Sequence, residues 1–125
     1  MATTKILPLV RRLRAGGQTT LVYGPVIVYL ESRNVSIATR TVALSPRRWL
    51  TLLLLVSRAG KTVSKDRLRK MLGQDTPLSE NGVEQIVSWL RDELEPAGIG
   101  IGAVRGRGYR LELRPLADGR FPARD

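Results

Sequence analysis

The fold of this chain is indicated above all by the stretch Ala103-Val104-Arg105-Gly106-Arg107-Gly108-Tyr109-Arg110-Leu111. Two glycines flank one arginine between two runs of residues that suit strands. Glycine readily adopts the positive φ of a tight turn, while β-branched and aromatic side chains favour the strands on either side. The stretch therefore predicts a β-hairpin, and its three arginines suit a polyanion.

Three helices are predicted ahead of the hairpin. Their N-cap residues are Ser45, Ser64 and Ser79, and their ends are marked by Gly60, Gly73 and Pro96. Apolar residues at helical spacing predict the buried side of the first helix (Trp49, Leu52, Leu53, Val56) and of the third (Val83, Val87, Leu90, Leu94). Short helices joined by a polar turn and followed by a hairpin predict a helix-turn-helix with a wing.

Residues 21–44 predict a meander of short strands. β-branched and aromatic residues fill Val26–Leu30, and apolar residues alternate with small or polar ones from Val35 to Leu44. Turns are expected at Gly24-Pro25 and at residues 32–34.

Residues 1–20 allow two interpretations, a short basic helix ended by Gly16-Gly17 or a basic arm that is the remnant of a linker. The expected organisation is this N-terminal segment, a winged-helix domain over residues 21–114 and a tail over residues 115–125.

The amino-acid composition limits the classes of function that this chain can have. The chain has 21 Lys and Arg against 11 Asp and Glu, a formal net charge of +10, which favours nucleic acid or an anionic membrane surface. The absence of Cys and His excludes disulfides, thiol nucleophiles, histidine bases and nearly every zinc or iron site, so we expect neither an enzyme nor a cofactor. The longest apolar run, Leu52–Val56, is far shorter than the ~20 residues of a membrane span, so we expect a cytoplasmic protein.

The run Gly98-Ile99-Gly100-Ile101-Gly102-Ala103 matches the dinucleotide-binding pattern G-x-G-x-x-A as a string. It follows a helix-ending proline and leads into a strand, whereas that pattern joins a strand to a helix. We therefore expect no dinucleotide site there.

From about Val26 to Leu113 the chain resembles the OmpR/PhoB-type winged-helix DNA-binding domain, the output module of many bacterial two-component response regulators. The resemblance rests on Leu44-Ser45-Pro46, Val63-Ser64-Lys65-Asp66-Arg67-Leu68, Leu90-Arg91 with Leu94-Glu95-Pro96, and Val104-Arg105-Gly106-Arg107-Gly108-Tyr109-Arg110. It implies an α+β fold, a winged helix-turn-helix with an N-terminal antiparallel sheet, three helices and a C-terminal β-hairpin wing.

The same resemblance implies which elements of the domain contact DNA and RNA polymerase. The third helix is expected in the major groove of double-stranded DNA, and Arg105 in the adjacent minor groove. The loop Gly73–Leu78 corresponds to one that often contacts RNA polymerase. The 125 residues contain no phosphoacceptor receiver domain, so we expect any control by phosphorylation to come from outside them.

The third helix departs from the family pattern. The family usually begins it with Arg-Thr-Val-Asp and continues with several basic residues, whereas this chain has Asn81-Gly82-Val83-Glu84. From Ser79 to Glu95 there are five acidic residues and one basic residue, a net charge of −4. In addition, Arg48 stands where the family commonly has an acid. The expected recognition helix is thus acidic in a basic protein.

Side chains off the apolar stripe are the candidates for base readout, because Asn and Gln pair with adenine, Ser bonds to several bases and Ile contacts a thymine methyl. The expected DNA-contacting residues are Asn81, Gln85, Ser88, Trp89 and Arg91 in the third helix, Arg105 and Arg107 in the wing, and Lys65 and Arg67 in the second helix. Two other interpretations of Ile86 and Trp89 remain open. They widen the core, or they dock a protein such as RNA polymerase, a related regulator or a second copy in a homodimer.

Overall fold

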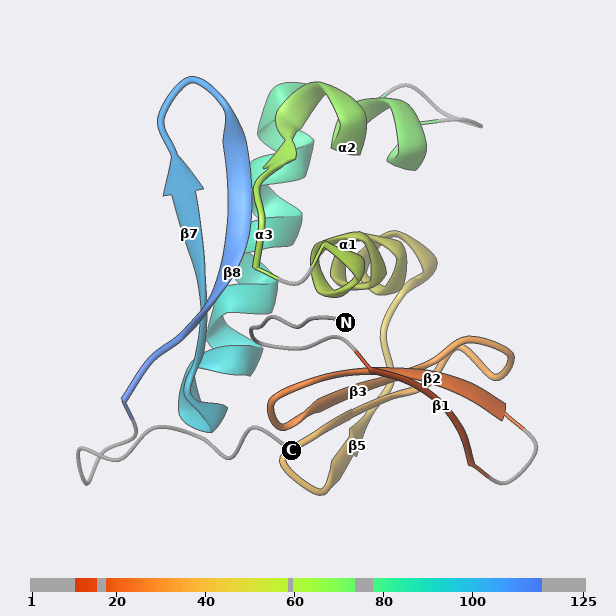
Figure 1. Ribbon diagram of the computed structural model, residues 1–125. Coiled ribbons are helices and arrows are strands. Elements are labelled where there is room, and N and C mark those ends of the chain that lie inside the picture. Colours follow the sequence, from red (N-terminus) through yellow and green to blue (C-terminus); the bar gives the residue numbers. More distant parts are fainter. Residues whose placement is uncertain (1–10, 16–17, 59, 74–77, 116–125) are drawn as a thin grey trace, which may run out of the picture.

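The computed structural model of the protein describes residues 11–15, 18–58, 60–73 and 78–115, and it shows two antiparallel sheets and three helices (Figure 1). The first sheet is a five-stranded meander in the order β1-β2-β3-β4-β5. Its strands are β1 (Arg11–Ala15), β2 (Gln18–Tyr23), β3 (Val26–Tyr29), β4 (Val35–Ile37) and β5 (Arg40–Val42). The predicted turns are confirmed at Gly24, with φ 56°, and at Arg33, with φ 61°.

The N-terminal segment corrects one of the two interpretations of residues 1–20, the short helix. Arg11–Ala15 is a strand, not part of a helix, and it pairs antiparallel with β2 in the register Leu13↔Thr20. A helix of that length is marginal on its own, whereas a strand at the edge of β2 gains a ladder of backbone hydrogen bonds. Residues 1–10 and 16–17 lie outside the described residues.

Helix α1 (Pro46–Ser57) lies between the five-stranded sheet and the other two helices (Figure 1). It packs on β2, α2, α3 and β8. For this reason its buried residues extend beyond the predicted stripe to Thr51, Leu54 and Leu55, while Leu53 is only half-buried. The helix is covered on most of its circumference, so a single apolar stripe described it incompletely.

Helices α2 (Lys65–Leu72) and α3 (Glu80–Leu94) follow the predicted caps. The hydroxyls of Ser45, Ser64 and Ser79 each accept a hydrogen bond from the backbone N–H three residues on, at 3.4, 3.0 and 3.0 Å. After α3, a turn of 3₁₀ helix, η1 (Glu95–Ala97), includes Pro96. The predicted stripe of α3 is confirmed, because Val83, Val87, Leu90 and Leu94 are at most 1% exposed.

The predicted hairpin is confirmed as β7 (Ile99–Val104) and β8 (Gly108–Leu113), which form the wing. A two-residue strand, β6 (Val63–Ser64), pairs with β8 to make a three-stranded sheet in the order β6-β8-β7. Strand β6 was not predicted from the sequence. No helix within the described part of the chain is long and apolar enough to cross a membrane.

Candidate nucleic-acid interface

The outward side of α3 carries the polar residues that the sequence placed there. Asn81, Gln85 and Ser88 are exposed, opposite the buried valine and leucine stripe. Helical periodicity decides this, because a residue two positions from a buried one points away from the core. These three side chains are therefore free to contact a ligand lying along α3.

The acidic charge of α3 is not spread evenly over that helix. Glu93 lies on the side toward the five-stranded sheet, where its carboxylate pairs with Arg40 of β5 at 3.5 Å. Asp92 and Glu95 are exposed near the C-terminal end of the helix, while Glu84 is exposed in its N-terminal half. Three of the acids are thus at the end of α3 that meets η1.

Ile86 and Trp89 are half-buried and pack against the core, as one of the three interpretations predicted. The Trp89 ring is also covered by an arginine of α1, since the Arg48 guanidinium carbon lies 3.9 Å from the ring centroid. The sequence showed that Arg48 replaces an acid, but not where its side chain lies. The position of an arginine that reaches across helices depends on tertiary packing.

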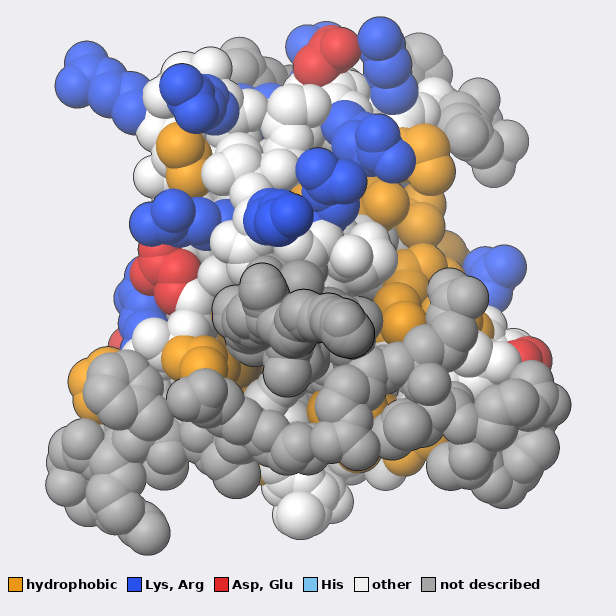
Figure 2. Space-filling model, in the orientation of Figure 1, with side chains coloured by type: hydrophobic (Ala, Val, Ile, Leu, Met, Phe, Trp, Pro, Cys, Tyr) orange, Lys and Arg blue, Asp and Glu red, His pale blue; other side chains and the backbone are white. Residues whose placement is uncertain are grey.

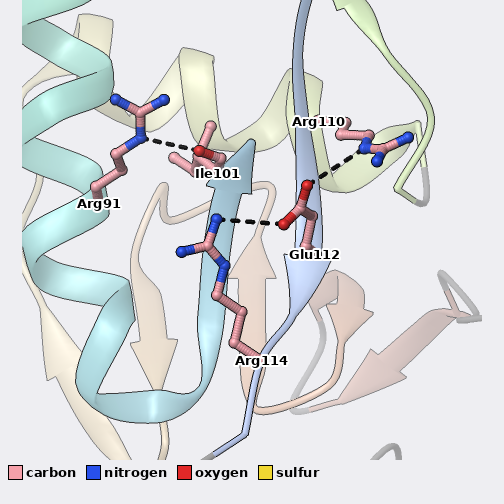
Figure 3. A network of polar contacts seen from close by, with 5 residues as sticks. All are labelled: Arg91, Ile101, Arg110, Glu112 and Arg114. Atoms are coloured by element: carbon pink, nitrogen blue, oxygen red, sulfur yellow. Dashed lines mark hydrogen bonds and ion pairs between the residues drawn. The ribbon is translucent and has the colours of Figure 1, made fainter. Parts of the chain in front are cut away.

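Arg91 connects α3 to the wing (Figure 3). Its Nε donates to the carbonyl oxygen of Ile101 in β7 at 2.8 Å, and its guanidinium carbon lies 5.9 Å from the Tyr109 ring centroid in β8. The side chain is half-buried. Arg91 thus contacts both strands of the wing.

The tip of the wing is bonded to the start of α2. The backbone N–H of Lys65 donates to the carbonyl oxygen of Arg107 at 3.3 Å, and a groove of about 430 Å³ lies between the two elements. The residues that line it are Ser64, Lys65, Asp66, Arg69, Gly106 and Arg107. Because this groove has three basic side chains and one acidic one, it is suited to a phosphate.

Most predicted basic residues of α2 and the wing are at the surface. Arg67, Arg105 and Arg107 are exposed, and Lys65 is half-buried with its Nζ 5.8 Å from the Tyr109 ring centroid. Lys and Arg side chains gather over the upper half of the face in Figure 2, where α2 and the wing lie. The structure thus brings together the basic residues that the sequence assigned to two separate elements.

A second basic cluster lies on the outer side of the wing. Glu112 accepts from Arg110 at 3.4 Å and from Arg114 at 3.2 Å (Figure 3). The Arg114 and Glu112 side chains lie over Gly100 and Gly102, where a Cβ would collide with them. A Cβ at either of these two glycines of the G-x-G string would therefore displace the side chain that lies over it. Glu112 also affects Tyr23 at the end of β2. The pKa of Tyr23 is raised above its ordinary value, mainly by burial and in addition by the negative charge of Glu112.

Two further predicted features concern residues at the limits of what is described. Of the loop Gly73–Leu78, residues 74–77 lie outside the described residues, while the carbonyl oxygen of Leu78 accepts from Arg69 Nε at 3.4 Å. Among the described residues there is also no group of three His, Cys, Asp or Glu side chains that could hold a metal ion.

The meander, the three helices and the wing define a winged helix-turn-helix domain of the DNA-binding class. Residues 39–111 match the family described as "Transcriptional regulatory protein, C terminal". The chain belongs to this OmpR/PhoB-type family, which consists of DNA-binding transcription regulators and is not a class of enzymes.

Individual relatives agree with the family match. The chain is 32% identical over 109 residues to the two-component response regulator PhoP of Pseudomonas aeruginosa, covering 85% of this chain and 48% of PhoP. It thus spans about half the length of the curated relatives it matches.

Two solved structures are similar in fold. One is the Klebsiella pneumoniae RstA DNA-binding domain in complex with the RstA box, with a TM-score of 0.62 and 26% identity over 74% of this chain and 95% of that one. The other is the DNA-binding domain of the response regulator AdeR in complex with an intercistronic region, with a TM-score of 0.65 and 25% identity over 75% of this chain and 99% of that one.

Proposed function

We propose that this chain binds double-stranded DNA sequence-specifically and regulates transcription in the bacterial cytoplasm, with α3 in the major groove and the wing on the adjacent minor groove or its phosphates. The observation that carries the proposal is the hydrogen bond from Lys65 N–H to the Arg107 carbonyl. It joins the wing tip to the start of α2, so that arginines of both elements flank one duplex. The complexes of RstA and AdeR with DNA support the same use of the fold here.

The proposed contacts divide into two kinds. Lys65, Arg67, Arg105 and Arg107 neutralise phosphates or enter the minor groove, and they supply most of the affinity because each neutralised phosphate releases counterions. Asn81, Gln85 and Ser88 face base edges, where an amide pairs with adenine in two hydrogen bonds. Discrimination between sequences is thus assigned to side chains that carry no charge.

Trp89 and Arg91, which the sequence placed in the same set, are proposed to act on DNA indirectly. The Trp89 ring is half-buried and covered by Arg48, and the Nε of Arg91 is bonded to Ile101. Both side chains hold α3 in position against its neighbours, so they set the orientation of the base-reading residues.

The experiment is selection of bound sequences from a random duplex pool at two salt concentrations. We expect an enriched motif at both, with binding weaker at high salt. Arg105→Ala should weaken binding to every duplex, whereas Gln85→Ala should change the preferred motif. The absence of duplex binding at low salt would exclude the proposal.

Protein docking through Ile86 and Trp89 is the less favoured alternative, because both residues pack on the core and Arg48 covers the indole. The resemblance further suggests RNA polymerase, through the loop Gly73–Leu78, and a second copy of the chain as partners on DNA. Sedimentation of the protein with and without its selected duplex tests the homodimer. A monomer bound to a single site would count against it.

A further inference from the structure

The net negative charge of α3 is repelled by the phosphates on either side of the major groove in which the helix is proposed to lie. Arg91 is the only basic residue between Glu80 and Leu94, and its Nε is bonded to the Ile101 carbonyl oxygen. The exposed side of the helix therefore presents Asn81, Gln85 and Ser88 together with the carboxylate of Glu84. A cation that lies beside the bases read by α3 therefore has to come from another element.

Helix α1 provides one. The guanidinium carbon of Arg48 lies 3.9 Å from the centroid of the Trp89 ring, which is the separation of a close cation–π contact. Trp89 follows Gln85 by four positions, so the two lie on neighbouring turns of the same side of α3. The aromatic ring of Trp89 thus holds a positive charge from α1 next to Gln85, one of the exposed residues of α3.

The Arg48 side chain also lies at an open groove. A space of about 370 Å³ separates the start of α1 from α3, and it is lined by Ser45, Arg47, Arg48, Leu78, Gly82, Gln85 and Ile86. In the described part of the chain Arg48 has no carboxylate partner. The first turn of α1 contains no acidic residue. The guanidinium is therefore available to an anion that approaches along α3.

We propose that Arg48 is a DNA-contacting residue, which binds a backbone phosphate next to the base read by Gln85 while Trp89 holds its guanidinium in place. This inference rests on the proposed function. It assigns to α1 the charge that α3 lacks. It also gives Trp89 a positioning role in DNA binding.

The chemistry of arginine fits this role. Stacking on an indole uses the face of the guanidinium and leaves its N–H groups, which lie in the plane of the group, free to donate to phosphate oxygens. Lysine has the charge but not the flat face. Arg48→Lys therefore separates the contribution of the charge from the contribution of stacking on the indole. Leucine at position 89 keeps an apolar side chain on the core and removes the ring.

A matched control exists in the same molecule. Arg33 lies over the Trp49 ring, with its guanidinium carbon 5.2 Å from the centroid. Arg33 lies between β3 and β4, and Trp49 is a buried residue of α1, so this pair joins α1 to the segment that connects two strands of the five-stranded sheet. Arg33→Ala removes an arginine from an indole without removing the charge proposed to contact DNA.

The test measures affinity for the duplex selected by the wild-type protein, over a series of salt concentrations. The single variants are Arg48→Ala, Arg48→Lys, Trp89→Leu and Arg33→Ala. One double variant combines Arg48→Ala and Trp89→Leu. We expect Arg48→Ala to lose about tenfold in affinity, the scale of one hydrogen bond to a charged group. The slope of log affinity against log salt should fall by about 0.9, the value for one phosphate. Arg48→Lys should keep the slope and lose part of the affinity.

Trp89→Leu should weaken binding less than Arg48→Ala, and the double variant should bind like Arg48→Ala, because the two side chains act through one contact. Arg33→Ala should bind DNA like the wild type. Thermal unfolding of each variant shows that it is folded. Should Arg48→Ala unfold, Arg48→Gln and Arg48→Lys provide the same comparison of charge.

The outcomes separate this inference from the proposed function. Wild-type affinity and slope in Arg48→Ala, together with weaker binding by Arg105→Ala, would overturn the role of Arg48 alone. An affinity loss without a change in slope would mean that Arg48 only supports the fold, and would overturn it too. A wild-type protein that binds no duplex would exclude both proposals.

Discussion

Two glycines of the same hairpin are needed for different physical reasons. Gly106 has a φ of +73°, and a Cβ there would meet nothing within 4 Å, so only its backbone conformation favours glycine. Gly108 has no such conformation. A Cβ at that position would instead collide with the carbonyl oxygen of Val63 in β6. The sequence indicated the turn correctly, but it could not show the close approach of a strand from elsewhere in the chain.

We expect Gly108→Ala to lower the free energy of unfolding by about 1–3 kcal/mol, the usual scale of overpacking, because β6 has to move away from β8. Gly106→Asn is the control, since asparagine tolerates the left-handed conformation and has open space there. Urea unfolding measures both variants. Equal stability of Gly108→Ala and the wild type would contradict the close approach.

The raised pKa of Tyr23 gives a pH dependence of stability. A raised pKa means that the folded state holds the phenol proton more tightly than the unfolded chain, whose tyrosine pKa is about 10. The stabilisation is complete below that value and is lost as the pH rises through the folded-state pKa. Tyr23→Phe should therefore flatten the fall in the free energy of unfolding at alkaline pH. An ultraviolet titration of tyrosinate in both proteins checks the assignment.

At the scale of elements, Arg91 joins α3 to β7. We expect Arg91→Ala to lower the free energy of unfolding by about 1.5–3 kcal/mol, because it removes a charged donor from the Ile101 carbonyl. The salt dependence of DNA binding should stay as in the wild type. Denaturant unfolding together with the salt series checks this, and a reduced salt slope would instead assign Arg91 a phosphate contact.

The elements that the sequence predicted best are those decided by neighbouring residues. Serine caps and apolar spacing located α2 and α3, since both signals act within a few residues along the chain. Strands β1 and β6 were missed because their stability comes from a partner strand. The sequence of residues 1–20 allowed a short basic helix or a basic arm but did not indicate β1, and the two residues of β6 are held by β8 from the far end of the chain.

The same limit applied to the candidate interface. The exposure of Asn81, Gln85 and Ser88 followed from helical periodicity and is confirmed. The contacts of Trp89 and Arg91 did not follow from it, because Arg48 comes from α1 and Ile101 from β7. Long side chains at the edge of a buried stripe reach neighbours that the sequence of one helix does not reveal.

At the scale of the whole molecule, the charges are divided between an acidic helix and basic neighbours. Glu84 is an exposed acid in the N-terminal half of α3, whereas Glu95 lies beyond its C-terminal end. We expect Glu84→Gln to raise DNA affinity roughly two- to fivefold at low salt, because it removes a repulsion between exposed charges. Glu95→Gln should have a smaller effect. Binding titrations of both variants at two salt concentrations test this order.

The pairing of the wing with the rest of the domain has a kinetic consequence. Val63↔Tyr109 and Ser64↔Gly108 pair β6 with β8, and the bond from Lys65 to Arg107 continues this connection to the tip. The tip is thus preorganised, and little conformational entropy is lost when it meets the duplex. A variant that loosens β6 should therefore leave DNA more quickly, while its association rate changes little.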